Sequence, residues 1–85
     1  MDIIIDEIKN AIIPEMKKMD IVVDSVEWIE ESKNNNTLRI VLDKVNGIDL
    51  DTIVDATNII NPILDEKDLI DKQYTLEVSS KERGN

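Results

Sequence analysis

The segment Tyr74-Thr75-Leu76-Glu77-Val78-Ser79-Ser80 constrains the fold more than any other, because it reads as a complete β-strand that comes last in the chain. Apolar and polar residues alternate along it, which places Tyr74, Leu76 and Val78 on one face. A strand this late must pair with strands formed much earlier, so the fold has to close on it. In a chain of 85 residues, this closure leaves room for one domain with one modest core.

Four further elements precede this strand, each with its own periodicity. Residues 2–19 carry apolar side chains at helical spacing, and residues 49–64 do so again. Residues 21–31 and 37–44 read as two strands, and the polar loop between them is short enough for an antiparallel hairpin. With the last strand at residues 74–79, the order is helix, strand, strand, helix, strand. It predicts an α+β two-layer sandwich in which both helices cover one face of a three-stranded sheet.

Local signals refine these elements. Pro14 predicts a kink or a restart in the first helix, and Asn61-Pro62 predicts a kink or the end of the regular part of the second. Asp49 is placed to cap the second helix, and the lost alternation at Asp24-Ser25 allows a bulge. We expect the buried face of the second helix to consist of Leu50, Ile53, Val54, Thr57, Ile60 and Leu64.

Composition excludes several kinds of chemistry. The chain has no cysteine and no histidine, which excludes disulfides, thiolate metal sites and histidine-dependent hydrolytic triads. A calcium loop around Gly47 fails because Leu42 would occupy its first ligand position. We therefore expect no catalytic residues, no cofactor and no metal site.

Charge and hydropathy indicate the kind of partner and the compartment. The 19 acidic and 10 basic residues give a net charge of −9, which disfavours phosphate backbones and attracts basic proteins. No run approaches the roughly 18 apolar residues of a membrane span, and the N-terminal segment is unlike a signal peptide. We expect a cytoplasmic protein with no membrane partner.

Two blocks of sequence resemble the N-terminal domain of the RimP family, the bacterial maturation factors of the small ribosomal subunit. The first joins Asp24-Ser25-Val26-Glu27-Trp28 to Thr37-Leu38-Arg39-Ile40-Val41-Leu42-Asp43-Lys44, and the second, at residues 74–80, matches the family's YTLEVSS. Relatives continue from the serine pair into PGLDRPL and an SH3-like domain, whereas this chain continues as Lys81-Glu82-Arg83-Gly84-Asn85. We expect residues 1–80 to form a RimP N-terminal-like domain and residues 81–85 a charged tail. The SH3-like domain is expected to be absent, as in a single-domain or truncated member.

The resemblance implies a non-enzymatic factor that assists assembly of the small (30S) subunit. RimP-like proteins bind this subunit or its precursors, partly by holding a basic small-subunit ribosomal protein. We expect a monomer with weak or no direct nucleic-acid binding. Its contacts are expected from exposed acids of the sheet and second helix, with two serines at the edge of the site: Glu27, Asp43, Asp51, Asp55, Glu77, Ser79 and Ser80.

Two alternatives remain open at this point. The chain could be an RNA-contacting KH-like module, although the GxxG loop of that class is absent. It could also be a structural domain that self-associates through the edge strand at residues 21–31. The RNA alternative would use a local basic spot made of Lys33, Arg39, Lys44, Lys81 and Arg83.

Overall fold

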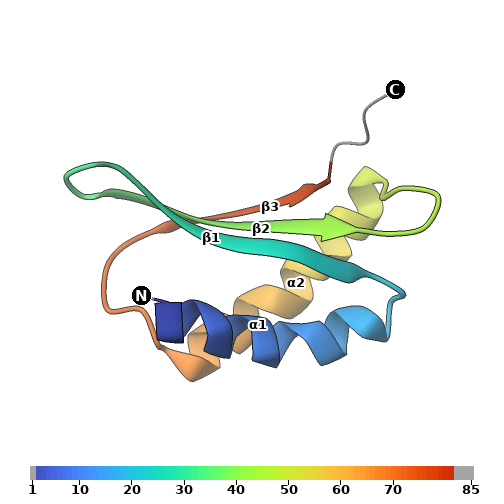
Figure 1. Ribbon diagram of the computed structural model, residues 1–85, viewed down its shortest axis with the longest axis horizontal. Coiled ribbons are helices and arrows are strands. Elements are labelled where there is room, and N and C mark those ends of the chain that lie inside the picture. Colours follow the sequence, from blue (N-terminus) through green and yellow to red (C-terminus); the bar gives the residue numbers. More distant parts are fainter. Residues whose placement is uncertain (1, 82–85) are drawn as a thin grey trace.

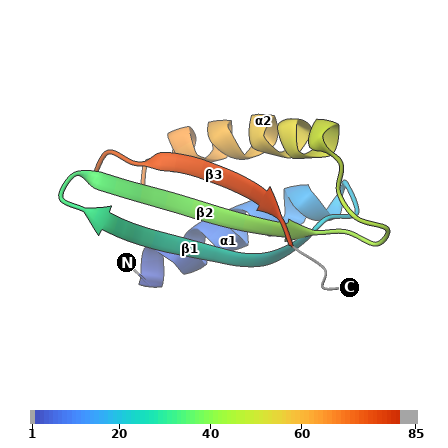
Figure 2. The same ribbon diagram turned by 90° about the horizontal axis from the view of Figure 1, so that it is seen from above.

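The computed structural model describes residues 2–81 of the chain. They form two helices and three strands, which are α1 (Asp2–Lys17), β1 (Val22–Ser32), β2 (Asn35–Asp43), α2 (Leu50–Lys67) and β3 (Thr75–Ser80). The sheet has the order β1-β2-β3, and β2 is antiparallel to β1 and parallel to β3. Both helices lie against the same face of the sheet (Figures 1 and 2). The predicted α+β architecture is therefore confirmed.

The core lies between the sheet and the helices, with the central strand β2 in the middle. Leu38, Ile40 and Leu42 alternate along β2 toward the helices, and all three are fully buried. Burying such apolar side chains away from water is the main force that holds the two layers together. Each helix buries one side in this core. The buried residues are Ile8, Ile12 and Met16 of α1 and Ala56, Ile60 and Leu64 of α2.

Strand β3 closes the fold, as its late position in the sequence requires. It lies beside β2 with Leu76 next to Leu38 and Val78 next to Ile40, so its apolar side chains extend the core. Beyond the strand, the backbone N–H of Lys81 donates to the carbonyl oxygen of Leu42 at 2.7 Å. Thr75, Glu77 and Ser79 of β3 are left on the opposite, helix-free face.

The hairpin contains the predicted bulge and a second one. Register shifts occur between Val23 and Ser25 and again between Glu30 and Ser32. The connection is shorter than the predicted loop, because β2 already begins at Asn35. Asn34 adopts a positive φ of 68°, a left-handed conformation that asparagine tolerates better than most residues.

The two prolines do not interrupt the helices. Helix α1 continues past Pro14 to Lys17, two residues before the expected end. Helix α2 continues past Pro62 to Lys67 and ends at Asp68, which takes the left-handed C-cap conformation and donates its N–H to the Leu64 carbonyl at 2.9 Å. Of the two outcomes predicted at Asn61-Pro62, a kink or an end of the regular helix, the end is therefore wrong. Proline removes one backbone hydrogen bond, and burial of α2 on both sides of this point outweighs that loss.

The buried face of α2 also differs from the expected one. Leu50 and Val54 were predicted to face the core, but they are 77% and 50% exposed. Ala56, which was not predicted, is fully buried instead. Asp49 caps the helix as expected, because its carboxylate accepts a hydrogen bond from the backbone N–H of Thr52 at 2.8 Å.

Candidate functional site

The helix-free face of the sheet, which we call the open face, carries a row of charged side chains across all three strands. Arg39 of β2 lies opposite Glu27 of β1 and beside Glu77 of β3 in the strand register. The arginine Nε donates a hydrogen bond to the Glu77 carboxylate, and the two groups form an ion pair. A cation on the central strand is therefore flanked by two acids, one on each neighbouring strand.

Electrostatics stabilise the charged form of the central cation, Arg39. The hydrogen bond to Glu77 raises the pKa of Arg39 above its ordinary value, and the charges of Glu27 and Glu31 act in the same direction. The guanidinium group therefore stays charged at every physiological pH. Both members of the ion pair are more than a third exposed, so water screens the pair and we attribute little stability to it.

Small hydroxyl side chains surround the charged row. Thr37 lies beside Thr75 on one side of it, while Ser25, Val41 and Ser79 form a row on the other side. Asp43 ends the open-face positions of β2, and its carboxylate accepts the backbone N–H of Lys44 at 2.9 Å. A shallow polar surface with short side chains and several acids suits contact with another protein better than enclosure of a small molecule.

The structure divides the seven predicted site residues into two groups. Glu27, Asp43, Glu77 and Ser79 share the open face. Ser80 is exposed but lies beside Leu42, at a position that alternates toward the helix side. Asp51 and Asp55 are exposed on α2, on the side turned away from its buried residues Ala56 and Ile60. The fold therefore does not bring these two acids together with the sheet acids.

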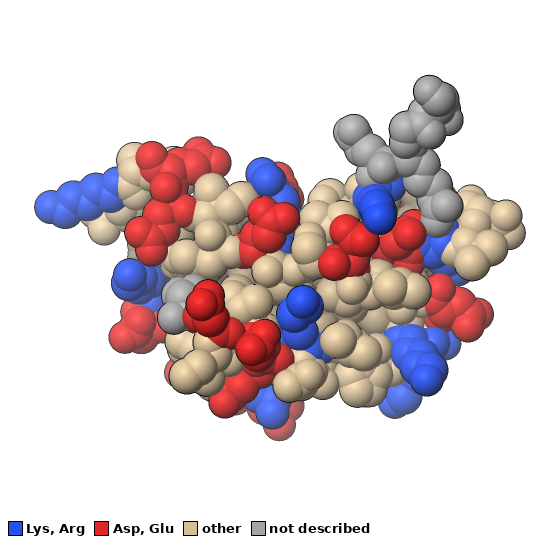
Figure 3. Space-filling view, in the orientation of Figure 1, with Lys and Arg blue, Asp and Glu red and all other residues tan. Residues whose placement is uncertain are grey.

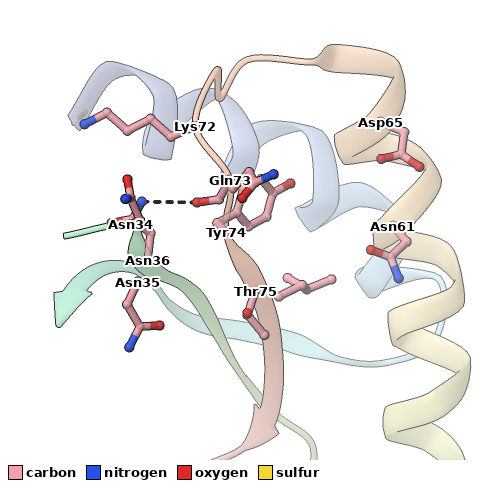
Figure 4. Close-up of a pocket in the computed structure, with 10 residues that line it drawn as sticks. Asn34, Asn35, Asn36, Asn61, Asp65, Lys72, Gln73, Tyr74 and Thr75 are labelled. Atoms are coloured by element: carbon pink, nitrogen blue, oxygen red, sulfur yellow. Dashed lines mark hydrogen bonds between the residues drawn. The ribbon is translucent and has the colours of Figure 1, made fainter. Parts of the chain in front are cut away.

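A polar cleft at the hairpin end of the molecule was missed by sequence reasoning (Figure 4). It has a volume of about 610 Å³ and lies between the hairpin turn, the start of β3 and the last turns of α2. Asn36 donates from its side-chain amide to the Gln73 carbonyl at 3.1 Å, which ties the hairpin to the start of β3. The asparagine run at residues 34–36 is the sequence feature that belongs to this cleft, although by itself such a run indicates only a turn. Its lining is Asn34, Asn35, Asn36, Asn61, Asp65, Lys72, Gln73, Tyr74, Thr75 and Leu76.

Tyr74 forms the apolar floor between this cleft and the core. Its ring packs edge-on against Trp28, with ring centroids 5.8 Å apart. Burial raises the pKa of the Tyr74 hydroxyl above its ordinary value, and the nearby carboxylates of Asp65 and Asp68 raise it further. The phenol is therefore neutral at physiological pH, and the aromatic pair packs against the core.

The basic spot of the RNA alternative is not assembled in the described part of the chain. Lys33 lies at the hairpin turn, whereas Lys44 follows the far end of β2, roughly 30 Å away along the strand. Arg39 is engaged by Glu77, and Arg83 lies outside the described residues. Figure 3 shows acidic and basic side chains interspersed on the side that faces the viewer, with no broad basic area.

Residues 2–81 lack the features of a metal site and of a membrane-spanning helix. No group of three or more acidic side chains there is arranged to hold a metal ion. Neither described helix is long and apolar enough to cross a membrane. In the same range, no buried side-chain polar atom lacks a hydrogen-bond partner.

Fold and surface together define a class: an acidic two-layer α+β domain in which both helices lie on one face of the sheet and leave the other face uncovered by helices. Residues 10–81 match the family model described as the RimP N-terminal domain. The chain belongs to the RimP family, whose members are ribosome maturation factors that interact with components of the small subunit. The resemblance seen in the sequence is confirmed.

Proposed function

We propose that this protein assists maturation of the small (30S) subunit in the cytoplasm, without catalysing a reaction, by binding a basic small-subunit ribosomal protein. Membership of the RimP family supports the general role. The basic client is inferred from the charge of this chain. At a net charge of −9, the molecule attracts a basic protein and repels the ribosomal RNA to which that protein would otherwise attach.

The observation that carries this proposal is the excess of acid on the open face. Glu27, Glu77 and Asp43 lie there, against Arg39 as the cation of the central strand. A lysine- or arginine-rich surface can approach the two glutamates from outside, while Ser79 offers a hydroxyl beside them. Acids at such a rim chiefly speed association and give it a strong dependence on salt.

The test is retention of purified small-subunit ribosomal proteins and 30S precursors on the immobilised chain. We expect one basic protein to bind in low salt and to be released as salt rises. The double variant Glu27→Gln, Glu77→Gln should weaken its binding about tenfold. The matched control Asp51→Asn, Asp55→Asn removes the same charge from the helix layer and should have a smaller effect.

Three results would contradict the proposal. Equal weakening by the two double variants would mean that only net charge matters and that the open face is not the site. RNA retained after removal of all ribosomal proteins would favour an RNA-contacting module. A tight dimer that binds none of these components would favour a self-associating structural domain.

A further inference from the structure

Within residues 2–81, strand β1 is an edge of the sheet whose outer side pairs with no other strand. It is 11 residues long, pairs with β2 along one side and lies at one end of the strand order β1-β2-β3. Figure 2 shows β1 along the outer margin of the sheet, whereas α2 runs alongside β3 at the other margin. In an edge strand, alternate residues direct their N–H and C=O groups outward, where they can pair with another extended chain.

The middle of β1 is regular enough to act as a template. The two register shifts lie at Val23/Ser25 and Glu30/Ser32, so residues 25–30 run uninterrupted between them. Bulges at both ends twist the strand away from further pairing and confine an added strand to this segment. The segment alternates between the open face, which holds Glu27, and the helix side, which holds the largely buried Val26.

The charge of β1 is of one sign. Val22–Ser32 contains four acids and no lysine or arginine, although lysine is a common protection of free edges in natural sheets. Three of the acids are engaged: Asp24 lies 3.2 Å from Lys81, Glu27 accepts the Ser25 hydroxyl at 3.4 Å, and Glu30 accepts the indole N–H of Trp28 at 3.0 Å. Among residues 2–81, Glu27 and Glu31 have no cationic partner within 4 Å.

We infer that the free edge of β1 binds an extended, lysine- or arginine-rich segment of the client as a fourth strand. This inference rests on the proposed function and states how the basic protein is held. Main-chain hydrogen bonds would supply the pairing, and basic side chains at alternate positions of the added strand would lie beside Glu27. A second copy of this chain fits the edge poorly, because two β1 strands side by side would bring their acids together.

The experiment uses two synthetic peptides of about ten residues in which lysine and threonine alternate. One peptide carries N-methyl groups on the backbone nitrogens of its odd residues, and the other carries them on those of its even residues. A strand that pairs along one edge uses the N–H groups of alternate residues only. One methylated peptide should therefore bind at least about tenfold more weakly than the other. Because the two peptides carry equal charge, equal affinities would overturn the inference in favour of a simple charge contact.

Variants of the full chain provide the second arm. Glu27→Gln with Glu31→Gln should weaken binding of the better peptide about tenfold, and Asp51→Asn with Asp55→Asn should change it less. On binding, the outward-facing amides of residues 25–30 should become protected from hydrogen exchange. Unchanged exchange at these amides, with the peptide bound, would contradict the edge as the site.

A third arm separates this inference from the proposed function. If a small-subunit ribosomal protein binds but leaves the β1 amides unprotected, the edge inference fails and the proposed function stands. If the peptides discriminate by methylation pattern but no small-subunit protein binds, the proposed function fails while the edge is supported as a peptide site.

Discussion

Among single residues, Asp49 has the best defined role because it caps α2. Its backbone is extended, with φ −87° and ψ 172°, and its carboxylate accepts the N–H of Thr52. This hydrogen bond lowers the pKa of the carboxyl group below its ordinary value. A helix N-terminus favours a negative charge at this position for the same reason, since its first N–H groups point outward unpaired.

A lowered pKa makes stability depend on pH with a definite sign. The contribution of Asp49 is fully present above the ordinary carboxyl pKa of 3.8 and is lost as pH falls through the lower folded value. Asp49→Asn should keep the cap but remove this titration, whereas Asp49→Ala should lose the cap at every pH. Urea midpoints measured from neutral to acid pH test both expectations. Identical acid limbs for the wild type and Asp49→Asn would show that the cap does not titrate.

The open face shows which features of the candidate site can be predicted from local sequence and which cannot. Alternation along β2 places Arg39 and Asp43 on the face opposite the buried residues. The row that joins Glu27, Arg39 and Glu77 depends on long-range register, and Glu77 follows Arg39 by 38 positions. No local pattern encodes that register. The helical pattern does place Asp51 and Asp55 on the second helix, but their separation from the sheet acids follows from how the two layers pack.

At the scale of elements, α2 shows why its buried face was assigned wrongly. Apolar residues occur on both sides of this helix, so two stripes fit the helical period almost equally well. The small side chain of Ala56 is fully buried, and the stripe through Ala56, Ile60 and Leu64 is the one that faces the core. Leu50 and Val54 are then turned outward. The existence of the helix followed from the sequence, but its end at Lys67 and its rotation were decided by packing.

Pro62 leads to a prediction about the same helix. It is exposed within a continuous helix, so an alanine there would restore a backbone hydrogen bond without disturbing the core. Allowing for the greater freedom that alanine gives the unfolded chain, Pro62→Ala should raise the free energy of unfolding by about 1 to 2 kcal/mol. Urea denaturation measures this change. The control is Pro14→Ala in α1, where an increase is also expected; a loss of stability in Pro62→Ala would contradict the reasoning.

The central strand allows a matched comparison of its two faces. Ile40 is fully buried between the layers, so Ile40→Ala should lower the free energy of unfolding by about 2 to 5 kcal/mol. Val41, the next residue, faces the open side and is only partly buried, so Val41→Ala should cost no more than about 1 kcal/mol. Denaturant unfolding of the two variants tests the assignment of faces. Similar losses would mean that another element covers the open face in solution.

At the scale of the whole molecule, the excess of negative charge affects folding and binding in opposite ways. With a net charge of −9 on 85 residues, like charges repel one another more strongly in the compact state than in the unfolded chain. The same charge is expected to keep copies apart, so we expect a monomer at low salt and neutral pH. Sedimentation velocity measures this directly, and a concentration-dependent dimer under these conditions would contradict it.

Salt therefore provides a test at this scale. Adding sodium chloride up to about 0.5 M shortens the Debye length to a few ångströms and screens the internal repulsion. The thermal midpoint of the free chain should rise by several degrees, while its affinity for a basic client falls over the same range. Asp51→Asn with Asp55→Asn removes two of the repelling charges and should reduce the salt effect on the midpoint. A midpoint that falls with salt would mean that attractive pairs such as Asp24–Lys81 outweigh the net repulsion, and the charge would then have to be explained by local pairing.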